Sequence, residues 1–179
     1  MVAPFRAAAA QTFKRRNWLY VPAGGFADYT APTALELGAA SVLDFTRMAF
    51  RDGTVPPTQS TNRVQEQARL GDDVGFERKG ITQLTGGTLT YAADPQVASG
   101  EDGKKVWEAF LDGPDGGWLV RRLNVARDTA VTAGQFVTIL PADLGPSLEV
   151  EVGDGESGEV GGNCDYFIRE AIKQMVALV

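Results

Sequence analysis

Short segments bounded by glycine or proline restrict most strongly how this chain can fold. The chain has 179 residues, of which 21 are glycine and 9 are proline. Residues 147–152 (S-L-E-V-E-V) alternate between apolar and acidic side chains, and this period of two is typical of a β-strand. The other predicted strands are residues 17–21, 41–46, 118–124 and 135–140, with two strands or one bent strand over 74–92. We therefore expect a mainly β fold of two packed antiparallel sheets, either a sandwich or a partly open barrel.

One flanking α-helix is predicted after residue 98. Its apolar side chains lie on one face because they are spaced four apart, and they are Val106, Trp107, Phe110 and Leu111. Ser99 precedes the helix and Asp102 follows three residues later, which resembles a capping box with aspartate in place of glutamate. Gly113 and Pro114 end it.

Residues 51–73 form the least regular stretch. They include Pro56, Pro57 and several hydroxyl and amide side chains but few large apolar ones, so they cannot bury themselves as a core element. We predict a long loop here, and long loops inside compact domains are usually functional or disordered. The expected organisation is an N-terminal arm over residues 1–16 and a single β-sandwich domain over residues 17–179.

The last segment, residues 165–179, fits two patterns. Ile168, Ile172, Met175 and Val179 recur at helical spacing, whereas Tyr166, Ile168, Ile172, Val176 and Leu178 would share one face of a strand. The content of glutamate, alanine, lysine, glutamine and methionine favours a helix.

The composition gives little support to catalysis. The chain has no histidine and one cysteine, Cys164, so histidine-dependent nucleophiles, a disulfide within the chain and a thiolate zinc site are excluded. The acidic runs around residues 94, 112–117 and 153–159 lack calcium-loop spacing and are expected as turns. Glu149 and Glu151 share a strand face that we assign to solvent or to a partner. We expect no enzyme activity, no cofactor and no metal.

Charge is divided unevenly along the chain. Residues 1–70 carry a net charge of +3 and residues 71–179 a net charge of −9, which gives −6 overall. Proteins that grip nucleic acid are usually basic, so specific DNA binding is not expected. A basic front and an acidic body suit head-to-tail contact between copies, although a solvated surface with chance clustering explains the charges equally well.

Four stretches in this order resemble the tail-tube proteins of siphophages, especially those that infect actinobacteria. The stretches are residues 18–22 leading to A31-P-T33, L35-E-L37 and a strand with Asp44; L89-T-Y91 leading to D94-P-Q96; a helix over 105–111 followed by G117-W-L-V-R-R122; and A133-G-Q135 before a strand that ends at Pro141. The likeness covers most of residues 15–153.

The resemblance implies a structural subunit of a bacteriophage tail tube. Such a subunit self-assembles into hexameric rings that stack into a hollow tube, and genomic DNA passes through the lumen without specific binding. Its partners would be further copies and other tail proteins such as the tape measure and the tail terminator. The loop over residues 51–73 would reach a neighbouring ring, with Arg51, Arg63 and Arg69 as inter-ring contacts.

Location and alternative functions follow from the same pattern. No secretion signal or membrane-spanning stretch is recognisable, so we expect synthesis in the host cytoplasm, no membrane association and a final place in the virion tail. One alternative is a head–tail connector or a capsid-decoration protein. A second is a small β-barrel enzyme or ligand-binding protein, which would need a pocket with converging polar groups.

Overall fold

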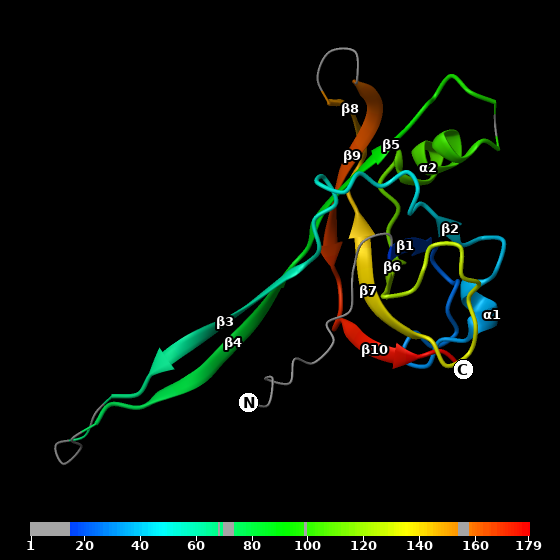
Figure 1. The fold of residues 1–179 in the computed structure, drawn as a ribbon. Helices are drawn as coiled ribbons and strands as arrows, with labels where there is room; N and C mark the ends of the chain where they lie inside the picture. The colour runs from blue at the N-terminus through cyan, green and yellow to red at the C-terminus, as the bar shows by residue number, and fades with distance from the viewer. Residues whose placement is uncertain (1–14, 68, 70–73, 99, 154–157) are drawn as a thin grey trace, which may run out of the picture.

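The chain folds mainly into β-strands (Figure 1), as the sequence predicts. The computed structural model describes residues 15–67, 69, 74–98, 100–153 and 158–179. The strands are β1 (Arg16–Val21), β2 (Leu43–Asp44), β3 (Thr58–Gln65), β4 (Glu77–Thr85), β5 (Gly87–Ala92), β6 (Gly117–Leu123), β7 (Phe136–Leu144), β8 (Leu148–Val152), β9 (Glu159–Ile168) and β10 (Lys173–Ala177). The helices are α1 (Ala34–Leu37) and α2 (Asp102–Phe110). The predicted N-terminal arm lies almost entirely outside the described residues.

The main sheet is curled into a partly open barrel (Figure 1). Its strand order is β2-β1-β6-β7-β9-β5, with β10 paired to β7 and β8 paired to β9, and all of these pairs are antiparallel. The second sheet contains only β3 and β4, which extend away from the body as a long hairpin. Of the two predicted forms of the mainly β fold, the sandwich and the partly open barrel, the structure shows the partly open barrel.

The curled sheet is covered on both faces at β1, which explains why this strand is buried almost throughout. Trp18 and Tyr20 contribute to the core under α2, and the alternating Leu19 and Val21 contribute to a second core. A strand covered on both faces reads as a continuous apolar run, and the N-W-L-Y-V segment has this character.

Helix α2 covers the larger core, but it begins later than the sequence suggested. Its N-cap is Glu101, whose side chain makes no capping hydrogen bond, and Ser99 lies outside the described residues. Val106 and Phe110 are fully buried, whereas Leu111 lies just beyond the helix and is 40% exposed. The predicted apolar face is therefore correct at its centre and wrong at Leu111.

The C-terminal segment forms strands, so the helix that its composition favoured is wrong. β9 extends to Ile168, and β10 then pairs with β7 through Val176↔Val137 and Ala177↔Phe136. Leu178 is buried in the second core. Pairing and burial supplied by distant residues override a local helical preference.

Candidate assembly surface

The β3–β4 hairpin is here called the arm and is distinct from the N-terminal arm. Its first strand lies in residues 51–73, the stretch predicted as a loop. That prediction is wrong for Thr58–Gln65, which pairs with Glu77–Thr85 from Thr58↔Thr85 to Gln65↔Glu77. All of β3 is exposed. The strand escaped detection because neither of its faces is covered, so it has no apolar alternation.

Close backbone packing attaches the arm to the body. Val55 N–H donates to Thr88 O at 2.8 Å, and Tyr166 O–H donates to Val55 O at 2.9 Å. At the same end of the arm, where β4 meets the body, a Cβ on Gly86 would lie 1.7 Å from Tyr166 O. Only glycine fits such a close approach, and Gly86 marks the boundary between β4 and β5.

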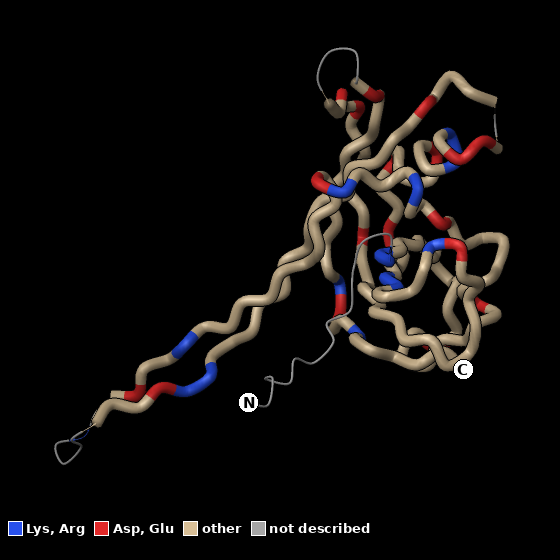
Figure 2. The backbone as a smooth tube through the Cα atoms, in the orientation of Figure 1, with Lys and Arg blue, Asp and Glu red and all other residues tan. Residues whose placement is uncertain are grey.

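Both faces of the arm carry an exposed ion pair, and one face also carries apolar side chains. The pairing register places Val64 and Phe76 on that face, 38% and 63% exposed, together with the pair between Arg78 and Glu66 at 3.9 Å. The opposite face carries the pair between Arg63 and Glu77 at 3.7 Å. Figure 2 shows basic and acidic residues together on the outer part of the arm. One face can therefore bury apolar surface against another molecule.

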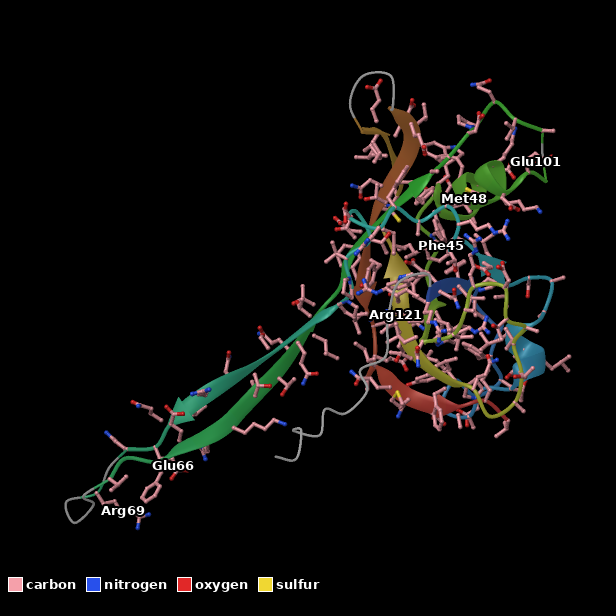
Figure 3. All side chains as sticks on the ribbon, viewed as in Figure 1. Phe45, Met48, Glu66, Arg69, Glu101 and Arg121 are labelled. Atoms are coloured by element: carbon pink, nitrogen blue, oxygen red, sulfur yellow. The ribbon has the colours of Figure 1, made fainter. Side chains whose placement is uncertain are left out.

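The three arginines predicted as inter-ring contacts do not lie together. Arg63 belongs to β3, and Arg69 lies near the outer end of the arm (Figure 3). Arg51 instead lies in a turn on the body, beside a pocket of about 460 Å³. Their contact with another copy stays a prediction.

This pocket is lined by both cationic and aromatic side chains. Arg16 and Trp18 come from β1, Phe50 and Arg51 from the segment beside β5, and Arg127 from the loop after β6. The sequence did not suggest the pocket because its residues are far apart along the chain and only the fold brings them together. The one acidic residue in its lining among those described is Asp128, which pairs with Arg47 at 3.3 Å and with Arg127 at 3.6 Å.

A further cation lies against Trp18, which lines the pocket. The guanidinium of Arg121, a residue labelled in Figure 3, lies 5.0 Å from the centroid of the Trp18 ring, and stacking of this kind is favourable. Burial lowers the pKa of Arg121, Tyr166 raises it, and the positive charge of Arg16 lowers it further. Within the part of the chain that the structure describes, no carboxylate pairs with Arg121.

Exposed carboxylates lie on β8. Glu149 and Glu151 are both exposed, and alternation puts them on one face. Glu151 is opposite Val160 of β9, which is 45% exposed. Neither glutamate has an ion pair within the described residues. The sequence assignment of this face to solvent or a partner fits its exposure.

Buried polar groups near β8 have a structural role. The Tyr91 and Ser147 hydroxyls are 2.5 Å apart and join β5 to the start of β8. Cys164 is buried beside them, and burial raises the pKa of its thiol to about 11. A neutral, covered thiol is a poor nucleophile. No group of three metal-ligating side chains occurs within the described parts of the chain.

Residues 7–157 match the model of a family described as "Phage tail tube protein". The chain belongs to the phage tail tube protein family. No curated protein matches the sequence significantly. A chain of the solved structure "Cryo-EM structure of the anti-feeding prophage (AFP) baseplate, 6-fold symmetrised" is 9% identical, with 98% of each chain covered and a TM-score of 0.48.

Family membership gives this tail tube protein a structural role in the phage tail and a place in the virion. It also implies assembly with other tail proteins. Across the described residues, no helix is long and apolar enough to span a membrane.

Proposed function

We propose that this tail tube protein assembles into hexameric rings that stack into a tube, and that phage DNA passes through the tube. The arm carries the proposal, because its two strands extend from the body with both faces uncovered in the isolated subunit. In the assembled tube the arm lies against a subunit of the adjacent ring.

The physical argument begins with the stability of the arm. A two-stranded hairpin without a packed face is marginally stable in water. The arm nevertheless carries apolar side chains at Val64, Phe76 and Ile81, of which Ile81 is 75% exposed. Burial against a second subunit would stabilise both the pairing and these side chains. Contact between unlike surfaces of identical subunits closes into rings or continues as filaments, and a tube needs both.

The charge of the protein supports a conduit for DNA. The net charge is −6, and affinity for DNA rises with the number of phosphates that a protein neutralises. An acidic wall would repel the phosphates and leave the DNA free to slide. Electron microscopy of the purified protein tests the assembly, because tubes support the proposal, whereas single rings indicate a connector and monomers contradict assembly.

A variant without the arm tests its role. Replacing residues 59–84 by Asn-Gly joins Thr58 to Thr85, which are direct partners in the ladder, through a favoured two-residue turn. We expect a folded subunit that forms no long tubes, with circular dichroism reporting the fold. Normal tubes from this variant would rule the arm out as the stacking element.

Point variants make the same test without deletion. Phe76→Ser combined with Ile81→Ser should shorten the tubes, because the arm would bury less apolar surface in the assembly. Leu35→Ser is the matched control, since Leu35 is 86% exposed on α1 of the body. Equal shortening by the control would point to a general effect of exposed apolar residues and contradict a specific role of the arm.

A further inference from the structure

The pocket beside β1 is lined by several positive charges and by one negative charge among the described residues. Arg16, Arg51 and Arg127 line it, and Arg121 lies over the ring of Trp18. The carboxylate of Asp128 is shared between Arg47 and Arg127, and no other carboxylate lines the pocket within the described residues. Like charges held close together are unfavourable, so this arrangement is suited to an incoming anion.

The lining also specifies what kind of anion fits. The rings of Trp18 and Phe50 and the methyl groups of Ala49 and Ala126 lie among the arginines. An occupant should therefore combine negative charge with apolar surface. One candidate occupant from the same chain is residues 1–14, which are close in sequence to the pocket residue Arg16. They contain Arg6 and Lys14 and no acidic residue. Their charge does not complement the pocket.

The exposed face of β8 has the complementary chemistry. Glu149 and Glu151 lie on it about 7 Å apart, the spacing of alternate residues in a strand, and Val160 is beside Glu151. β8 pairs with β9 along one edge, and within the described residues no strand pairs with its other edge. Glu149 and Glu151 are both exposed, so the acidic face is accessible to a neighbouring molecule.

We propose that Glu149 and Glu151 of one copy dock into the pocket of another copy of this chain, here called the arginine pocket, which is lined by Arg16, Arg51 and Arg127. The two surfaces belong to different parts of the body (Figures 1 and 2), so the contact is heterologous and each copy can both give and receive it. The inference deepens the proposed function by naming a contact between subunit bodies in addition to that of the arm.

Complementary charge reversal tests the contact. In the full-length chain, Arg51→Glu with Arg127→Glu makes the pocket acidic, and Glu149→Arg with Glu151→Arg makes the β8 face basic. Each double variant should weaken self-association about tenfold or more, because like charges then meet at the contact. Sedimentation velocity over a range of concentrations measures the effect, and circular dichroism checks that each variant folds.

Recombining the two variants provides the decisive measurement. Mixed in equal amounts, they should associate again, because the basic face of one fits the acidic pocket of the other. The quadruple variant should also associate on its own. Glu108→Arg with Asp112→Arg and Lys104→Glu with Lys105→Glu are matched controls near α2, and both should associate like the wild type.

Three results would overturn the inference. Undiminished association of the charge-reversed variants would show that the pocket is not a contact. If only the pocket variant loses self-association, the pocket binds another segment or a different anion and not Glu149 and Glu151. Folded variants that do not recover on mixing would contradict the specific pairing. Sedimentation detects self-association whatever the shape of the assembly. A wild-type protein that associates without forming tubes would therefore contradict the proposed tube but not the proposed contact between Glu149, Glu151 and the pocket.

Discussion

At the scale of single residues, Phe110 holds the larger core together. Its ring makes edge-to-face contacts with Tyr20, Phe45 and Tyr91 at centroid distances of 5.2 to 5.3 Å, an arrangement that adds to the effect of burial. Phe110→Ala should lower the free energy of unfolding by about 3–5 kcal/mol. Leu111→Ala is the control, and its exposed site should cost much less. Equal unfolding midpoints in denaturant for the two variants would contradict this packing.

Asp143 should make stability depend on pH. Its carboxylate accepts hydrogen bonds from Gly116 N–H at 2.8 Å and from Arg169 at 2.7 Å, and these contacts lower its pKa below the ordinary 3.8. The ionised form is therefore the stabilising one, present above about pH 4 and lost as pH falls through the lower folded pKa.

Asp143→Asn should therefore destabilise the protein by on the order of 1 kcal/mol at neutral pH. The difference from wild type should shrink as acid protonates Asp143. Unfolding in denaturant at several pH values measures it, with the exposed Asp115→Asn as control. A difference that stays constant from pH 7 to strongly acidic conditions would assign the effect to something other than this carboxylate.

Individual residues were predictable where spacing alone decides their environment. Val106 and Phe110 are four apart and are both buried. Arg16 and Arg127 could not be predicted as neighbours of one pocket, because their proximity follows from how β1, β6 and the following loop pack. The chain contains no local signal for such a relation.

At the scale of elements, the sequence predicts the strands that show alternation or a run of β-branched and aromatic residues, and it does not predict β3, the first part of β9 or β10. β8 was visible from its strict alternation. β3 lacks alternation because both of its faces are exposed, and β10 has a helical composition that pairing with β7 overrides. Burial of one strand face leaves a periodic pattern in the sequence, whereas pairing between distant strands leaves no local pattern.

The arm should behave differently from the body in hydrogen exchange. In subunits kept unassembled at low concentration, amides of β3 and β4 should exchange much faster than those of β6 and β7, because an exposed hairpin opens locally at little cost. Assembly should slow the exchange of the arm. Mass spectrometry of peptides from the two regions makes the comparison, and an arm that is equally protected before and after assembly would contradict its role in stacking.

At the scale of the whole molecule, charge sets the expected behaviour toward DNA. With a net charge of −6, the protein should show no measurable binding to duplex DNA at physiological salt. Fluorescence anisotropy with a labelled duplex is a sufficient test. Tight binding that weakens steeply with added salt would contradict a passive conduit and indicate that the arginine pocket takes phosphate.

The uncovered arm also affects how the subunit remains soluble before it assembles. Open strand edges invite pairing with any other chain, and proteins limit this hazard with charged side chains and bulges. The arm has both, since its register shifts between Thr61 and Arg63 and its outer part carries Lys79 and the Arg63–Glu77 pair. We therefore expect newly made subunits to persist as a soluble pool, and polymerisation to begin with a lag that preformed seeds abolish.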